Sequence, residues 1–289
     1  MKLLKTKERV AESKLTWNTT INGAARSYAV TTYDSINPDS NTPPVLNLNG
    51  IGEGSYSAAV APAILGANVI SPILPFRGEL ELTPVNIERI AAEVPELVAI
   101  EGLKKINASR IGGNSFTSMD MIARSQGGAP GIRAVSENKD LFNKLALVMP
   151  FGLNSEQLGI GIKARRARIL CRLALASAKS NPFDYGNFRS STEVSSFMLG
   201  SLLRGDLLND LDAALSFDLV DEVKELADSK DVAVFIGTSD PLFKPSELSR
   251  NLSDSNVAIM RVSGGHATVG SRRGREQLKI AYNWLQSDS

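Results

Sequence analysis

The stretch Val45-Leu46-Asn47-Leu48-Asn49-Gly50-Ile51-Gly52 decides the fold of this chain. It starts as a short apolar strand and passes into a turn that is rich in glycine. An alanine-rich helical segment follows at 56–65, and another strand is expected at 67–75. A strand, a helix and a strand in immediate succession are typical of parallel sheets covered by helices.

The same alternation continues along the rest of the sequence. Further strands are expected at 110–112, 145–150, 232–236 and 257–262, and helices at 84–106, 116–125 and 277–286. Two β-prone runs at 15–34 meet at Asn22-Gly23, which predicts an antiparallel hairpin. The predicted class is therefore α/β, with a mostly parallel central sheet, helices on both faces and the N-terminal hairpin at one edge.

One long segment departs from this alternation. Between Phe151 and Ser216 the sequence contains helical stretches and no clear strand. We therefore expect a core domain formed by residues 1–150 and 217–289, with residues 151–216 inserted as a helical cap.

Composition narrows the classes of function. Hydrophobic residues make up 43% of the 289 residues, and the net charge is +1, so no global field favours nucleic acid or a membrane surface. No stretch approaches the ~18 apolar residues of a membrane span, and the start of the chain lacks the apolar core of a secretory signal. A single cysteine, Cys171, fits a reducing compartment, so a cytoplasmic location is expected.

The sequence gives no support for a metal or another cofactor. One histidine and one cysteine leave only carboxylates as metal ligands, without the spacing of a loop cage. The glycines at 50, 52 and 54 suggest a dinucleotide fingerprint, but Ser55 stands where its third glycine is required. An acid is also missing near position 74. We expect no cofactor.

The candidate catalytic residues are a serine, an acid and the chain's single histidine. His266 lies in Ser263-Gly264-Gly265-His266, and two possible partners precede it. Ser115 lies in Gly113-Asn114-Ser115-Phe116-Thr117, and Asp240 lies in Gly237-Thr238-Ser239-Asp240-Pro241. Each is expected to follow a strand, where open α/β sheets place their sites. Histidine suits proton transfer because its ordinary pKa lies near neutrality.

These residue types predict nucleophilic catalysis. Ser115 would attack from a tight turn at Gly113, His266 would take and return its proton, and Asp240 would fix the tautomer of the imidazole. The oxyanion that forms needs backbone N–H donors. We expect these donors from Phe116 and from Ile51, in the loop after the strand at 45–48.

Over roughly residues 15–286 the chain resembles the α/β-hydrolase superfamily with a helical cap. The matching segments are 46–52, 66–78, Gly237-Thr238-Ser239-Asp240 and Gly265-His266 before a terminal helix, in the chain order serine, acid, histidine. Two positions depart from the family's pattern. Thr117 replaces the last glycine of the nucleophile turn, and Asn49 stands where histidine is frequent, so that an amide would hold the oxyanion loop.

The resemblance implies a serine hydrolase that cleaves an ester, thioester or amide-like acyl bond of a small molecule. Two alternatives stay open: a ligand-binding protein that does not use its triad, and a carbon–carbon bond hydrolase with the same triad. A serine nucleophile disfavours dehalogenase and epoxide hydrolase chemistry, which would use an aspartate.

The acid also has an alternative. If Asp240 is not the acid, Glu156 is the nearest carboxylate after Met149. The sequence does not determine the oligomeric state, and a homo-oligomer is one of the possibilities.

Overall fold

The computed structural model describes most of the chain outside the expected cap. The described ranges are 10–21, 23–37, 40–50, 53–66, 68–74, 84–110, 114–153, 217–240 and 245–287. Between 154 and 216 the structure describes only Arg189, Thr192, Glu193, Ser195, Ser196 and Leu199, all in helical conformation. The prediction of a cap at 151–216 therefore lies largely outside the described residues, as does Glu156.

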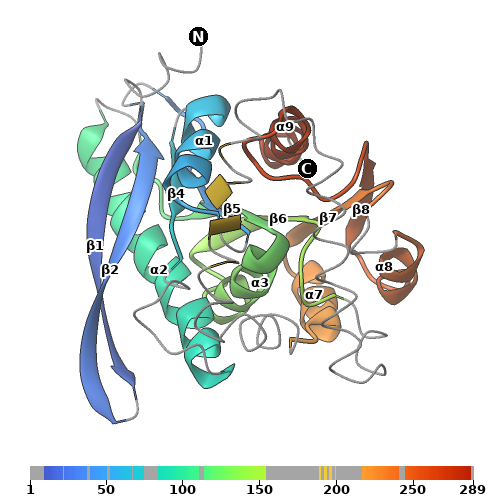
Figure 1. The fold of residues 1–289 in the computed structure, drawn as a ribbon, viewed down its shortest axis with the longest axis horizontal. Helices are drawn as coiled ribbons and strands as arrows, with labels where there is room; N and C mark the ends of the chain where they lie inside the picture. Colours follow the sequence, from blue (N-terminus) through green and yellow to red (C-terminus); the bar gives the residue numbers. More distant parts are fainter. Residues whose placement is uncertain are drawn as a thin grey trace.

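The described part is built on one sheet of eight strands, in the order β1-β2-β4-β3-β5-β6-β7-β8 (Figure 1). The strands are β1 Ala11–Ile21, β2 Ala24–Ser35, β3 Val45–Leu48, β4 Val69–Pro72, β5 Met119–Arg124, β6 Phe142–Val148, β7 Asp231–Gly237 and β8 Ala258–Val262. The helices are α1 Ser55–Leu65, α2 Pro84–Ser109, the 3₁₀ turn η2 Ser125–Gly127, α3 Gly128–Glu137, α7 Val220–Ala227, α8 Pro245–Asn251 and α9 Arg272–Leu285.

The N-terminal hairpin is confirmed. β1 and β2 pair antiparallel with Ile21 opposite Ala24, so only two residues join them. Gly23 has φ +77°, a conformation that glycine adopts without steric cost and that such short hairpin turns require. β2 then pairs antiparallel with β4, and the pairs from β4 through β3, β5, β6 and β7 to β8 are parallel.

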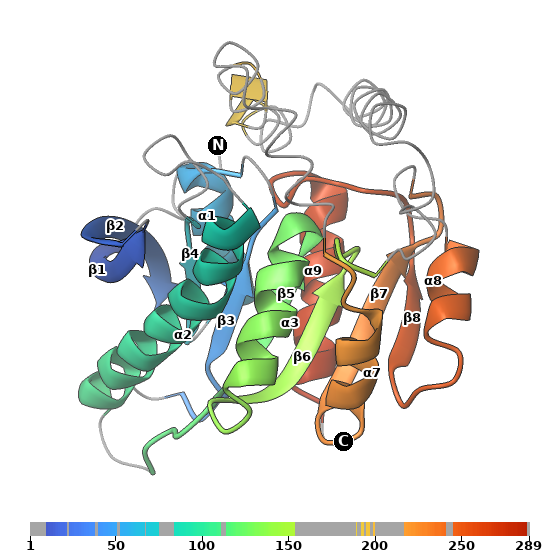
Figure 2. The ribbon, with the colours of Figure 1, turned by 90° about the horizontal axis from the view of Figure 1, so that it is seen from below.

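Helices cover the parallel strands on both faces. α1 and α9 lie together on one face, while α2, α3 and α7 follow one another across the other (Figures 1 and 2). Every residue of β3 and of β5 is buried, as expected for central strands enclosed on both sides. The predicted class, a mostly parallel sheet between helical layers, is confirmed.

The helix expected at 116–125 is wrong. Residues 119–124, Met-Asp-Met-Ile-Ala-Arg, form the central strand β5. A helix is expected there because one follows the serine of a nucleophile turn, which the sequence assigns to Ser115. Methionine, alanine and arginine also have good helix propensity. Burial of all six residues between two helical layers decides for the strand, because tertiary packing overrides intrinsic propensity.

The strand expected at 110–112 is not seen in the described residues. Arg110 lies outside any strand, and residues 111–113 are outside the described part.

Among the described helices, none combines the length and the apolar character needed to cross a bilayer.

Candidate active site

Ser125 lies on the sharp turn that follows the carboxyl end of β5. Its φ is +51°, a left-handed conformation that is uncommon for a residue other than glycine. The 3₁₀ turn η2 starts at this residue and leads into α3. Strain of this kind at a residue between a strand and a helix is typical of a nucleophile turn, because it exposes the side chain at the edge of the sheet.

Small residues around Ser125 allow this turn to approach the sheet closely. A Cβ on Gly127 would lie 2.6 Å from the carbonyl oxygen of Asn49 and 2.9 Å from that of Leu48. A Cβ on Gly131, one turn into α3, would lie 2.5 Å from the Cβ of Ala123. These distances are too short for real contacts, so the approach requires glycine at both positions.

A chain of hydrogen bonds joins Ser125 to His266 and Asp240. The Oγ of Ser125 lies 2.9 Å from Nε2 of His266, and Nδ1 of His266 lies 3.3 Å from Oδ2 of Asp240. The Asp240 side chain is fully buried, whereas that of His266 is 17% exposed. A carboxylate only accepts hydrogen bonds, so Nδ1 carries the proton and Nε2 is left to accept from the serine hydroxyl.

Backbone contacts hold the two loops that carry the acid and the histidine. The N–H of Ser239 donates to the carbonyl of Gly264 at 2.9 Å, and a Cβ on Gly237 would lie 2.7 Å from the same oxygen. From α9, the buried amide of Gln277 donates to the carbonyls of Ser263 and Gly265, at 3.2 Å each. Asp240 and His266 are therefore set by packing of the loops against each other and against α9.

An aromatic side chain closes one side of the histidine. The ring of Phe151, which follows β6, meets the imidazole edge to face with centroids 6.5 Å apart. The Phe151 N–H donates to the carbonyl of Ser125 at 2.8 Å, so this residue is tied to the nucleophile turn as well. Phe151 is 5% exposed and provides an apolar surface beside Ser125 and His266.

The structure corrects the expected position of the serine. Ser115 is exposed and precedes β5, so it lies at the amino end of that strand, whereas Asp240 and His266 follow the carboxyl ends of β7 and β8. Parallel strands place all their carboxyl ends at one edge. Ser115 is therefore at the opposite edge from His266, and Ser125 is the serine that contacts it.

The expected oxyanion donors are affected in the same way. The N–H of Phe116 donates to Oδ1 of Asn107 at 2.9 Å, at the edge remote from His266, so Phe116 is wrong as a donor. Ile51 lies outside the described residues. Its neighbour Gly50 packs against the serine, since a Cβ on Gly50 would lie 3.1 Å from the Cβ of Ser125.

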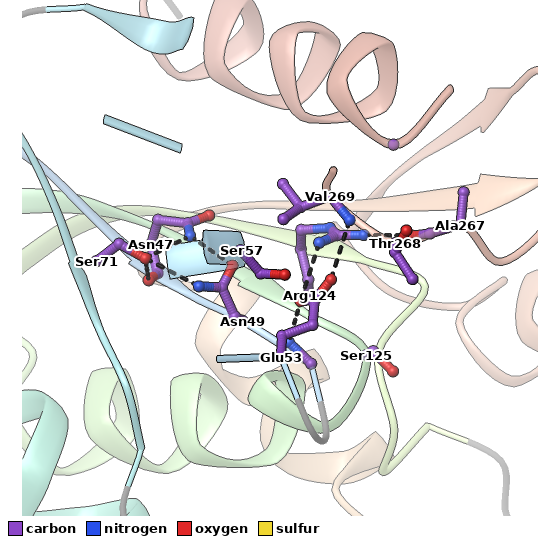
Figure 3. A network of polar contacts seen from close by, with 12 residues as sticks. Asn47, Asn49, Glu53, Ser57, Ser71, Arg124, Ser125, Ala267, Thr268 and Val269 are labelled. Carbon is purple, nitrogen blue, oxygen red and sulfur yellow. Dashed lines mark hydrogen bonds and ion pairs between the residues drawn. The ribbon is translucent and has the colours of Figure 1, made fainter. Parts of the chain in front are cut away.

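Asn49 stands where the family often has histidine, and it belongs to a buried polar network with Asn47 and Ser71 beside Glu53 and Arg124 (Figure 3). Its Oδ1 accepts from the Asn47 amide at 2.9 Å, and both amides donate to Oγ of Ser71 at 3.0 Å. The Ser71 hydroxyl in turn donates to the carbonyl of Asn47. The Asn49 amide is thus fixed to β3 and β4, while residues 51–52 of the loop that follows lie outside the described part, so its role in holding the oxyanion loop stays a prediction.

A sequence signal for Ser125 existed but differs from the expected pattern. The segment Ala123-Arg124-Ser125-Gln126-Gly127 has a small residue, the serine and a glycine at the spacing of the nucleophile turn. Because Ala123 stands at the first position, the segment does not match the usual pattern, which begins with glycine. Gly113-Asn114-Ser115 has the glycine but no strand before it in the described residues. Thr117 consequently has no role in the turn, whose last position is Gly127.

Metal ligands do not gather in the described part of the chain. Among those residues, no group of three or more His, Cys, Asp and Glu side chains is placed to hold an ion.

Comparisons with known proteins identify the architecture. No family model matches the sequence, and no curated protein matches it. Among solved structures, a thermophilic esterase from Thermogutta terrifontis is 18% identical, with a TM-score of 0.62 over 94% of this chain and 98% of that one. A haloalkane dehalogenase from Bradyrhizobium elkani is 14% identical, with a TM-score of 0.62 over 96% and 97%. An enol-lactonase from Burkholderia xenovorans is 17% identical, with a TM-score of 0.61 over 94% and 100%.

These similarities extend over nearly the whole chain in each pair, so the fold is shared. The three solved structures are named for three different reactions, and a shared fold does not decide among them. The family resemblance drawn from the sequence is confirmed at the level of the fold.

Proposed function

We propose, on the premise that this chain has the α/β-hydrolase fold, that it is a serine hydrolase that acts on an acyl bond of a small molecule. Ser125 is its nucleophile, His266 its general base and acid, and Asp240 the group that orients the imidazole. The bond cleaved is an ester, a thioester or an amide-like linkage, and the reaction passes through an acyl-enzyme that water hydrolyses.

The observation that carries this proposal is the unbroken path from Ser125 to Asp240. Its two contacts, 2.9 Å and 3.3 Å, connect residues that come from three different loops at one edge of the sheet. His266 removes the serine proton during attack and returns a proton to the leaving group. The buried carboxylate of Asp240 stabilises the imidazolium that forms between these steps.

The same geometry suggests which groups stabilise the oxyanion. In this proposal the first donor is the backbone N–H of Gln126, the residue after the nucleophile, which replaces Phe116 in that role. The second is the N–H of Ile51, as expected from the sequence. Its neighbour Gly50 packs close to the nucleophile, since a Cβ at Gly50 would lie 3.1 Å from the Cβ of Ser125. The Gly50 N–H itself is already bonded to Glu53 at 2.8 Å and so is not counted as a donor.

Labelling with a fluorophosphonate tests the proposal without a known substrate. The intact protein is incubated with the reagent, and the modified peptide is identified by mass spectrometry. We expect an adduct on Ser125 that is lost in His266→Ala, because an unactivated serine hydroxyl is a weak nucleophile. Ser115→Ala is the matched control, since it removes an exposed serine from the opposite edge.

The other possible outcomes would each contradict a different part of the proposal. An adduct on Ser115 would return the nucleophile to the position that sequence alone suggested. No adduct on a protein shown to be folded would contradict the proposal and favour a binding protein on the same scaffold. An adduct that persists in His266→Ala would contradict the role of the histidine.

A further inference from the structure

A buried ion pair lies directly behind Ser125. Nη1 of Arg124, the residue before the nucleophile, is 3.3 Å from Oε2 of Glu53 in the loop between β3 and α1 (Figure 3). The two side chains are only 4% and 5% exposed. Removing two charges from water has a large desolvation penalty, so a buried pair is weak evidence for stability and raises the question of another role.

Each partner of this pair makes further hydrogen bonds to backbone atoms. Oε2 of Glu53 accepts from the N–H of Gly50 at 2.8 Å, and its Oε1 accepts from the N–H of Val269 at 2.9 Å. Nη2 of Arg124 donates to the carbonyl of Ala267 at 2.6 Å. The pair therefore connects three segments: the loop after β3, the nucleophile turn and the loop that carries the histidine.

The backbone atoms that the pair holds are adjacent to the reacting groups. Ala267 directly follows His266 in the chain. Gly50 lies against the nucleophile, since a Cβ at Gly50 would be 3.1 Å from Cβ and 3.5 Å from Oγ of Ser125. A shift of the Glu53 carboxylate would thus move the loop that faces the oxyanion and the histidine loop together. Catalytic groups tolerate displacements of only about 0.5 Å.

We propose that Glu53 and Arg124 form a positioning pair that sets the loop after β3 and the histidine loop against Ser125. This inference rests on the proposed function, because it assigns a role within the same site. Neither residue reacts with substrate. They act through Gly50, Ala267 and Val269. Their effect is on the geometry in which Ser125 attacks the acyl carbon and in which water then hydrolyses the acyl-enzyme.

The substitution Glu53→Gln gives the sharpest test. It keeps the size of the side chain, but its single carbonyl oxygen serves only one side of the network. The new NH₂ group then faces a donor, either the N–H of Val269 or the N–H of Gly50 with Arg124. A positioning role predicts a fall in kcat of at least about tenfold with KM within about twofold, because the lost alignment belongs to the transition state.

The arginine supplies a conservative comparison. Arg124→Lys keeps the charge but has no planar fork to bond Glu53 and Ala267 together, whereas Arg124→Met removes the charge as well. We expect Arg124→Lys to retain a rate between wild type and Arg124→Met. The double variant Glu53→Gln/Arg124→Met should be no slower than the slower single variant, since the two residues act as one unit.

Asp34→Asn is the matched control for the loss of a buried carboxylate that forms an ion pair. Asp34 has a 5% exposed side chain and binds the more exposed Lys105 at 2.6 Å. It pairs with Ile70 near the start of β4, at the edge of the sheet remote from the site. We expect this variant to lower the unfolding temperature while the kinetics remain those of wild type.

The experiment compares the rate of fluorophosphonate addition to Ser125 in these variants, together with kcat and KM on an ester that the wild type hydrolyses. All rates are taken at a temperature at which each variant is fully folded.

Slow addition in Glu53→Gln, with the rate of Asp34→Asn unchanged, supports the inference. Wild-type rates in folded Glu53→Gln overturn it, and so do equal losses in Asp34→Asn. If Glu53→Gln does not fold, Arg124→Lys at the rate of wild type overturns it. A wild type that is not labelled overturns the proposed function instead.

Discussion

The side chain of Glu193 caps helix α1, because the N-cap residue of that helix, Gly54, has no side chain that could do so. Gly54 is the N-cap residue of α1 and offers no side-chain hydrogen bond. Its N–H and the N–H groups of Tyr56 and Ser57 donate to the Glu193 carboxylate, at 3.0, 2.7 and 3.2 Å. The Ser57 hydroxyl adds a fourth bond at 2.8 Å. A residue more than a hundred positions away thus satisfies the first turn of the helix after the loop at 50–53.

Glu193→Gln should weaken this cap. The amide keeps one acceptor oxygen but loses the negative charge that favours the helix N-terminus, at a cost of roughly 1 kcal/mol. Hydrogen exchange at the amides of Tyr56 and Ser57 should become faster. Glu101→Gln, which affects an exposed pair with Lys104 on α2, is the control and should leave these amides unchanged. Unchanged protection in Glu193→Gln would mean that the cap contributes little in solution.

Ser125→Ala should abolish turnover, while Ser115→Ala should not. We expect kcat to fall by about 10⁴-fold or more in Ser125→Ala, because members of a triad act as one unit. Steady-state hydrolysis of an activated ester measures both variants. A large loss in Ser115→Ala with an active Ser125→Ala would reverse the assignment made from the hydrogen bonds.

Asp240→Asn should lower kcat by a similar order, about 10⁴-fold, by favouring the wrong tautomer of His266. The unfolding midpoint and the kinetics of a chromogenic ester are measured together. Asp254→Asn is the matched control, because the Asp254 side chain is exposed and forms an ion pair with Lys224 at 2.7 Å. If Asp240→Asn keeps the activity of wild type, another carboxylate orients the histidine.

Gly127→Ala should disturb the nucleophile turn. Its Cβ would lie 2.6 Å from the Asn49 carbonyl oxygen, so the backbone must move, at a cost of about 1–3 kcal/mol. We expect both a lower free energy of unfolding and a lower kcat. Gly23→Ala, strained by its φ of +77° in the hairpin, should lower stability alone. Equal kcat values for the two variants would show that the turn accommodates the added methyl group.

Asp120 makes stability depend on pH. Burial raises the pKa of its carboxyl to about 6, and the nearby Lys144 opposes this only in part. Between its unfolded pKa of about 3.9 and this raised value, the folded state binds more protons, so the destabilisation grows as pH rises through this window and is complete above pH 6. Asp120→Asn should therefore be more stable than wild type at pH 8, by roughly 3 kcal/mol, and equal to it near pH 3.

Urea unfolding across this pH range measures the effect. Asp120 sits near the amino end of β5, away from Ser125, so the ester kinetics of Asp120→Asn should match those of wild type. Asp231→Asn, in which a partly exposed neighbour is neutralised, is the control and should show a smaller pH dependence. A constant difference between Asp120→Asn and wild type at all pH values would contradict a titration of this carboxyl.

Local patterns were sufficient for much of the architecture. The Asn22-Gly23 turn, the apolar run before Asn49 and the strands before Asp240 and His266 could all be read from short stretches, because their hydrophobic pattern and turn residues agree with the fold. The contact of Asp240 with His266 was likewise anticipated, since the carboxyl ends of neighbouring parallel strands must meet at one edge.

The sequence by itself thus determined the α/β class, the hairpin, and the acid and histidine of the candidate site. Only the tertiary structure decided the serine. The segment 119–124 has residues that suit a helix, but its burial between two helical layers makes it a strand. This places Ser125 at the same edge as Asp240 and His266, and Ser115 at the other edge. The bonds of Glu53 and Glu193 to distant backbone groups were equally hidden, because nothing in local sequence specifies which loops the packed sheet brings together.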